Sequence, residues 1–279
     1  MPDKRPLLER HHFLLRRLHS LTGIAPIGVF LISHMLTNSS IAWGLADSHK
    51  NELGHGGVAT FQHEVNFIHS IPFLLIIELT LWVSIAFHSI LGFVYAATGS
   101  SNTAHYGYAA NWRYRLQRLS GYVGVVFIFY HVATLRWGWT FLVPGGTQWS
   151  GEFAASTTAA VLRGGPQGIS LAAIAVAFFY FAGVSLLVFH FANGLWTAAI
   201  TWGLTVSRES QRRWGYVCGA VGAGLMLMAW SSLGVFLAME PDAARAVEQK
   251  MAAGHSARES IDLVSLERAA GLKKKDASK

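Results

Sequence analysis

Five long apolar stretches constrain this chain of 279 residues more than any other feature of its sequence. Their predicted limits are 21–43, 67–97, 116–143, 169–204 and 214–239. A transmembrane helix needs about 20 apolar residues to cross a hydrocarbon core of roughly 30 Å. Only 13% of the residues are charged, about half the content of a soluble domain. The sequence therefore predicts an all-α integral membrane protein with five transmembrane helices, the first four forming a bundle.

The remaining segments are polar, and we expect loops at 44–66, 98–115 and 145–168. They divide the chain into a membrane domain, residues 1–239, and a charged C-terminal tail, residues 240–279. Pro26 predicts a kink in the first helix. The single cysteine excludes an internal disulfide and a cysteine-ligated iron–sulfur cluster. The net charge of +7 comes mostly from bases at membrane edges and in the tail, so no nucleic acid is expected as a partner.

The basic residues predict the orientation of the helices. The N-terminal segment, the loop before the third helix together with the start of that helix, and the loop before the fifth helix carry 5, 3 and 3 Arg or Lys residues. The opposite side carries Lys50, Arg136 and Arg163. The positive-inside rule therefore places the N-terminus in the cytoplasm, and five crossings place the C-terminus outside.

Each of the first four apolar stretches contains one deep histidine: His34, His88, His131 and His190. Helical rise places His34 and His131 about 15 and 18 Å from the predicted outer ends of their helices. The same rise places His88 and His190 about 24 and 32 Å from the outer side. The histidines thus form an outer and an inner pair, and two facing imidazoles at one depth are what a bis-histidine haem requires. We therefore predict a bundle around two b-type haems.

Two other roles are open to each histidine taken singly, namely a hydrogen-bonded packing residue and part of a proton path. Ionisable groups inside a bilayer are rare and usually functional, so four histidines paired by depth favour haem. Glycines near the histidines (Gly23, Gly121, Gly124, Gly183 and Gly194) would let a flat macrocycle approach the backbone. Close packing between helices explains each glycine equally well.

Several segments around these histidines resemble one family of membrane proteins. They read RRLHSLTG at 16–23, FHSILG at 87–92, LQRLSG at 116–121, FYHV at 129–132 and FHFANGLW at 189–196. Over about residues 13–238, the chain resembles the five-helix, di-haem cytochrome b membrane-anchor subunit of succinate dehydrogenases that reduce menaquinone. That subunit is related to the cytochrome b of fumarate reductases. The tail lies outside the resemblance.

The resemblance implies a fold, cofactors and partners. The four histidines would be the axial ligands of two haem b groups, His34 with His131 and His88 with His190. The chain would sit in the bacterial cytoplasmic membrane, as part of the respiratory chain, with flavoprotein and iron–sulfur subunits as partners. It would pass electrons from the iron–sulfur subunit to menaquinone. Family fumarate reductases carry a glutamate two residues before the fourth ligand, where this chain has Val188, so a proton path through that glutamate is not implied.

Menaquinone reduction needs a proton-exchanging group near the outer haem, and Glu64, His63 and Glu78 are the candidates. A solvated loop face explains Glu64 and His63 equally well. The alternative for Glu78, somewhat favoured, is a protonated, hydrogen-bonded packing residue, because a lone carboxylate in a low dielectric takes up a proton. At the inner edge, Arg17, His19 and Arg118 could contact haem propionates or a partner subunit. Anchoring at the membrane edge explains the two arginines equally well.

The chain itself has no dinucleotide-binding fingerprint and no cysteine cluster, so succinate oxidation must belong to a partner. The fourth apolar stretch would be about 54 Å long as a helix, so we expect its inner end to project from the bilayer and contact that partner. Two alternatives remain open. One is the cytochrome b anchor of a fumarate reductase or another quinone-linked oxidoreductase. The other is a haem-free transporter that uses histidines for protons, although no inverted repeat is evident.

Overall fold

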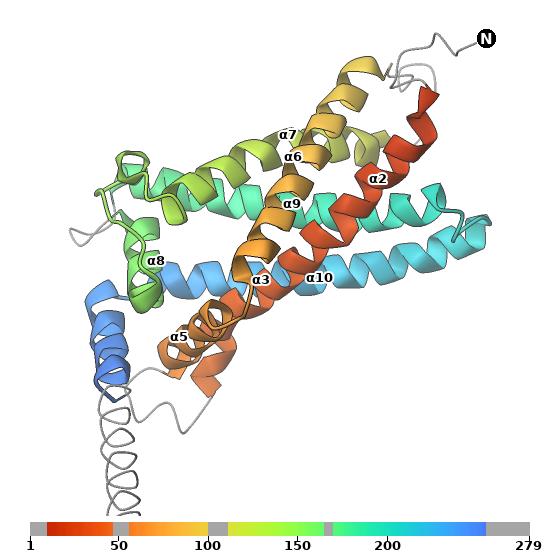
Figure 1. Ribbon diagram of the computed structural model, residues 1–279. Coiled ribbons are helices and arrows are strands. Elements are labelled where there is room, and N and C mark those ends of the chain that lie inside the picture. Colours follow the sequence, from red (N-terminus) through yellow and green to blue (C-terminus); the bar gives the residue numbers. More distant parts are fainter. Residues whose placement is uncertain (1–9, 47–55, 100–110, 165–169, 255–279) are drawn as a thin grey trace, which may run out of the picture.

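The computed structural model describes residues 10–46, 56–99, 111–164 and 170–254, and every regular element in these ranges is a helix (Figure 1). The described elements contain five helical stretches that are long and apolar enough to cross a membrane: His12–Ala46, Leu74–Thr98, Asn111–Leu135, Leu171–Thr201 and Arg208–Ala238. The predicted all-α class with five transmembrane helices is confirmed.

The first transmembrane stretch consists of α2 (His12–Ile24) and α3 (Pro26–Trp43), followed by the short helix η1 (Gly44–Ala46). The break falls at Pro26, as predicted, because proline has no N–H to donate within a helix. α2 begins nine residues before the predicted limit of 21, so the basic residues Arg16 and Arg17 lie inside the helix. Their long side chains can reach the membrane edge from that position.

The segment predicted as a loop at 44–66 contains a helix, α5 (Gly56–His69), so that prediction is wrong. Val58, Phe61 and Val65 recur at helical spacing and are buried. α5 packs against α3, and the close approach requires Gly57, where a Cβ would lie 2.2 Å from the Ile41 carbonyl oxygen. The next helix, α6 (Leu74–Thr98), therefore starts after Pro72 rather than at residue 67.

The third transmembrane helix, α7 (Asn111–Leu135), begins five residues before the prediction and ends eight residues before it. Its first turns are polar, and Arg113 and Gln117 have hydrogen-bond partners on the fourth helix. After Leu135 the chain turns through Gly138, which has a left-handed φ of 69°, and forms η2 (Thr140–Leu142).

A second predicted loop, 145–168, contains η3 (Gly151–Phe153) and the helix α8 (Ala154–Arg163), so this prediction is also wrong. Eight of the ten α8 residues are buried, most of them alanine, serine or threonine. The small side chains of α8 allow it to pack against α5 and against the last two transmembrane helices. α8 ends at Gly164, whose φ is 83°.

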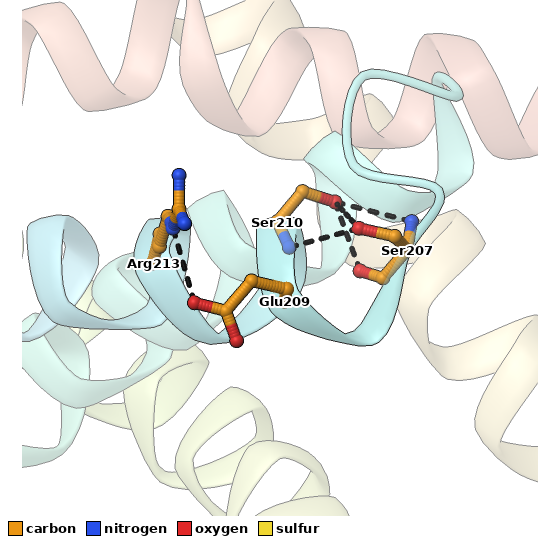
Figure 2. Close-up of polar contacts among 4 residues, drawn as sticks. All are labelled: Ser207, Glu209, Ser210 and Arg213. Carbon is orange, nitrogen blue, oxygen red and sulfur yellow. Dashed lines mark hydrogen bonds and ion pairs between the residues drawn. The ribbon is translucent and has the colours of Figure 1, made fainter.

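α9 (Leu171–Thr201) and α10 (Arg208–Ala238) pack along each other, and α10 also packs against α3. α10 starts six residues before the predicted limit because Ser207 and Ser210 form a capping box (Figure 2). Each serine hydroxyl accepts a hydrogen bond from the other's backbone N–H, at 3.0 and 3.1 Å. An ion pair from Arg213 to Glu209, 3.1 Å, extends along the same turn.

The most buried region lies at the end of the bundle that carries α5, α8 and the helix of residues 241–254, which is blue in Figure 1. The described part of the tail thus folds back onto the membrane domain, with Ala244 and Val247 in the core of this region. We call this region the cap. By the predicted orientation it lies on the outer side of the membrane.

Glu248 fixes the tail to the cap. Its side chain is 1% exposed and accepts hydrogen bonds from the backbone N–H groups of Ala155 and Ser156, at 2.7 and 3.2 Å, and from the Ser156 hydroxyl at 2.5 Å. Phe153, the N-cap residue of α8, has no side-chain acceptor. The Glu248 carboxyl, 92 residues beyond Ser156, instead accepts the hydrogen bonds of the free N–H groups at the start of α8. Burial raises the pKa of the Glu248 carboxyl above its ordinary value of 4.5, although its hydrogen bonds oppose that rise.

We expect Glu248→Ala to loosen the tail, because two buried N–H groups of α8 lose their acceptor. The cost should be about 1–3 kcal/mol, measured as faster proteolysis within residues 241–254 of the purified protein. Glu248→Gln keeps one acceptor oxygen and should stay docked. The Glu248 carboxyl keeps its proton to a higher pH in the docked tail than in the undocked tail. Docking of the wild-type tail should therefore weaken as pH rises through the raised pKa of Glu248.

The ratio of proteolysis rates between wild type and Glu248→Gln, taken at each pH, removes the pH response of the protease. That ratio should increase with pH above 4.5. A ratio that stays constant, or equal rates for the alanine and glutamine variants, would show that Glu248 does not hold the tail.

Candidate functional site

The four deep histidines form two pairs of facing imidazoles in the centre of the bundle. The rings of His34 and His131 are 5.8 Å apart between centres, at an interplanar angle of 84°. The rings of His88 and His190 are 6.1 Å apart, at 80°. A metal–imidazole bond is about 2 Å long, so a metal ion between two ring nitrogens places the ring centres roughly 6 Å apart. Both pairs therefore have the spacing of two axial ligands.

Hydrogen bonds orient both rings of the inner pair, His88 and His190. The Nδ1 atom of His88 lies 2.8 Å from the backbone carbonyl oxygen of His19. That of His190 lies 3.2 Å from the carbonyl oxygen of Gln117 and 3.1 Å from the Ser120 hydroxyl. A proton on Nδ1, donated to these carbonyls, leaves Nε2 with a free lone pair. Metal-ligating histidines are commonly held in this way.

Aromatic side chains surround the outer pair, His34 and His131. The Phe30 ring stacks on His34 at 5.3 Å, while Phe127 and Tyr180 each lie 5.8 Å from the His131 ring. The Nδ1 atom of His131 is buried and has no hydrogen-bond partner in the described part of the chain. The outer pair therefore sits in a more apolar pocket than the inner pair.

Glycines provide space for the inner imidazoles. A Cβ atom at Gly23 would lie 2.6 Å from the His88 ring, and one at Gly121 would lie 3.2 Å from the His190 ring. The other glycines serve helix packing: Gly124 is in contact with Leu187, and Gly183 with Phe127. Gly194 has no neighbour closer than 4.0 Å at the Cβ position.

His19 lies beside the inner pair, where its ring stacks on that of His88 at 4.0 Å and 10°. Its Nδ1 atom and the hydroxyl of Tyr95 are both buried without a hydrogen-bond partner among the described residues. The two rings are 5.7 Å apart, and the Arg16 guanidinium lies 6.0 Å from the Tyr95 ring. Two orphaned polar groups next to a cation suit the carboxylates at the edge of a haem. Tyr95 was not predicted from the sequence, where it is one aromatic residue among many.

The two arginines predicted at this edge have other contacts. The Arg17 guanidinium lies 5.7 Å from the Trp202 ring, and Trp202 donates a hydrogen bond to Ser20. Arg118 donates hydrogen bonds to the Tyr114 hydroxyl at 2.8 Å and to the Ala96 carbonyl oxygen. Both arginines thus tie the ends of helices together at the predicted inner edge.

The three residues predicted for quinone chemistry do not converge. Glu78 does have a hydrogen-bond partner, but that partner is the Arg136 guanidinium at 3.1 Å, so Glu78 belongs to an ion pair and is not a lone carboxyl. The reason is tertiary: α7 ends at Leu135, and Arg136 then lies opposite α6. On α5, His63 is exposed and Glu64 is half-buried.

Comparison with known proteins gives one informative relative. The chain is 31% identical to the succinate dehydrogenase cytochrome b558 subunit of Bacillus subtilis strain 168 over 226 residues. The match covers 81% of this chain and 97% of the relative. The chain belongs to the succinate dehydrogenase cytochrome b subunit family. No protein-family model and no solved structure matches.

Membership of this family agrees with the five apolar helices and makes the chain a multi-pass membrane protein. The position at which related fumarate reductases carry a glutamate holds Val188, which is fully buried and packs with Met35 and Leu225. No carboxyl group is available at that place.

Proposed function

We propose that this chain anchors a succinate dehydrogenase in the bacterial cytoplasmic membrane and carries electrons from its iron–sulfur subunit through two b haems to menaquinone. The observation that carries this proposal is the spacing of the four deep histidines. The ring centres within each of the two pairs lie 5.8 and 6.1 Å apart, as two imidazoles that hold one iron between them would. The named relative, a cytochrome b subunit of the same enzyme, supports it.

The residues of each pair would hold one haem. When bound, haem supplies an iron that cycles between ferric and ferrous states and so accepts and donates single electrons. His88 and His190 present Nε2 because backbone carbonyls hold their Nδ1 protons. Gly23 and Gly121 leave space beside these rings. His19 Nδ1 and the Tyr95 hydroxyl would donate hydrogen bonds to the haem carboxylates at the inner edge.

Partner subunits would dock at the end that carries the N-terminus, which we place in the cytoplasm. Arginines from α2, α7 and α10 gather at that end, as the positive-inside rule requires. α9 has 31 residues and is about 46 Å long, so it exceeds a hydrocarbon core of roughly 30 Å. Its last turn, the exposed Trp202 that follows it, and the exposed Arg208, Arg212 and Arg213 offer a surface to a soluble partner.

The proposal is tested by purifying the complex through a tag on this chain. We expect flavoprotein and iron–sulfur subunits to copurify, and a pyridine haemochrome assay to give two b haems per chain. The complex should reduce a menaquinone analogue with succinate. A purified chain that contains no haem would reject the proposal in favour of a haem-free membrane protein.

A further inference from the structure

Resting on the proposed function, we propose that Arg113 is a positioning residue for the inner ligand His190. Through Asn193 and Gln117, it fixes the hydrogen bonding of that imidazole and raises the reduction potential of the inner haem.

The residues concerned form a ladder between α7 and α9. On α7, Arg113, Gln117 and Ser120 share one face because they are three or four residues apart. On α9, the facing residues are His190, Asn193 and Trp196, three residues apart. The helices pack closely along this line, where Gly121 approaches the His190 ring. The ladder connects the centre of the membrane to its predicted inner edge.

Each step of the ladder is a hydrogen bond donated by a side chain. Arg113 donates to the Asn193 Oδ1 atom through Nε and Nη2, at 3.0 and 2.7 Å. Asn193 Nδ2 donates to the Gln117 Oε1 atom at 2.8 Å. Gln117 Nε2 donates to the backbone carbonyl oxygen of His190 at 3.2 Å and lies 3.3 Å from its Nδ1 atom.

Arg113 can only donate, so it sets the direction of the bonds at Asn193, while the backbone carbonyl oxygen of His190 can only accept and holds the Gln117 nitrogen at the other end of the ladder. It therefore holds the Asn193 oxygen toward itself and turns the Asn193 nitrogen toward Gln117. Gln117 must then present its oxygen to Asn193 and its nitrogen to His190. Without Arg113, only the bond from Gln117 to the His190 carbonyl oxygen opposes reversal of the two amides. In the reversed arrangement that bond is given up and the Gln117 oxygen would face the His190 ring.

The direction of the Gln117 amide matters for the haem. As observed, the Nδ1 proton of His190 has only the Gln117 backbone carbonyl and the Ser120 hydroxyl as acceptors. A reversed amide would add a third acceptor, make the imidazole a stronger electron donor and favour ferric iron. The ladder as observed therefore favours ferrous iron and a higher potential.

The positive charge of Arg113 also favours a higher reduction potential of the inner haem. Its guanidinium stacks on the Trp196 ring at 4.3 Å, and Trp196 is held by a hydrogen bond to the Gln211 carbonyl oxygen at 2.9 Å. No carboxylate forms an ion pair with Arg113 in the described part of the chain. A positive charge that is half-buried and unneutralised stabilises the less positive, reduced haem.

The test is a redox titration of the haem spectra of the purified complex. The inner component is identified as the one lost in His190→Ala. We expect Arg113→Leu to lower the reduction equilibrium constant of this component by about tenfold, the lower end of what loss of a partner behind a metal ligand causes. For one electron, a tenfold change is 59 mV. Arg113→Lys keeps a charged donor and should restore most of the shift.

Two controls separate the ladder from a general effect of charge. Arg115→Leu removes the same charge from an exposed side chain two residues along α7, which points away from the ladder. Its effect on the inner haem should be less than about twofold, since exposed charges are strongly screened. In a Gln117→Met background, Arg113→Leu should have a smaller effect than in wild type, because the hydrogen-bonded link to His190 is already broken and only the contribution of the Arg113 charge remains.

The inference is overturned if Arg113→Leu and Arg115→Leu shift the inner potential equally, or if the Arg113→Leu shift is unchanged in the Gln117→Met background. It is also overturned if Arg113→Leu raises the potential. Loss of the inner haem in Arg113→Leu, with its retention in Arg113→Lys and Arg115→Leu, would support the positioning role. These outcomes are distinct from failure of the proposed function, because in that case the wild-type complex would contain no haem.

Discussion

His190→Ala and His88→Ala should each reduce the haem content from two per chain to one, and both should remove the same spectral component. The two imidazoles face each other at 6.1 Å, so loss of either leaves the inner haem with a single protein ligand. His34→Ala and His131→Ala should both remove the other component, since their rings are 5.8 Å apart. The measurement is a pyridine haemochrome assay combined with low-temperature difference spectra.

Added imidazole offers a sharper version of this experiment. Alanine leaves a space the size of the lost ring, and free imidazole should restore the missing component if the histidine is a ligand. His12→Ala serves as the matched control, because His12 is exposed on α2, and it should retain both components. If His34→Ala and His88→Ala removed the same component, the assignment of the two pairs would be wrong.

At least one of the variants Glu78→Gln and Glu64→Gln should lose most of its quinone reduction while keeping both haems in place. Reduction of a quinone takes up two protons, so a site inside the membrane needs a group that exchanges them. Glu78 is the better placed, because its partner Arg136 is five residues beyond His131, about 7.5 Å along the helix direction. Removing a general acid–base group should slow succinate-to-menaquinone turnover about 100-fold or more.

The ion pair calls for a control that separates proton exchange from structure. Arg136 is 62% exposed and Glu78 30%, so the pair itself should contribute little to stability. If Glu78 exchanges protons, Arg136→Gln should impair quinone reduction far less than Glu78→Gln does. Equal losses in these two variants would assign the pair a structural role. Normal quinone reduction in both glutamate variants would move the proton route elsewhere, with His63 as the next candidate. Electron transfer from succinate to an artificial acceptor should remain normal in each variant.

The sequence by itself determined the fold class and the histidine pairing. A hydrocarbon core of roughly 30 Å admits only helices of a minimum length, so five apolar stretches could be identified from composition alone. One histidine in each of four stretches, with alternating helix direction, then fixed which imidazoles lie at equal depth. The rings of His34 with His131, and of His88 with His190, lie together in agreement with these depths, while their role as haem ligands stays a prediction.

Only the tertiary structure decided the cap, the partner of Glu78 and the ladder behind His190. α5 and α8 read as polar loops because neither contains an apolar run long enough to cross a membrane, and their burial depends on distant elements such as the tail with Glu248. Arg136 is 58 residues from Glu78, and Asn193 is 80 residues from Arg113. Pairings over such separations depend on how the helices rotate and pack, because helical periodicity fixes which residues share a face but not which face of another helix they meet.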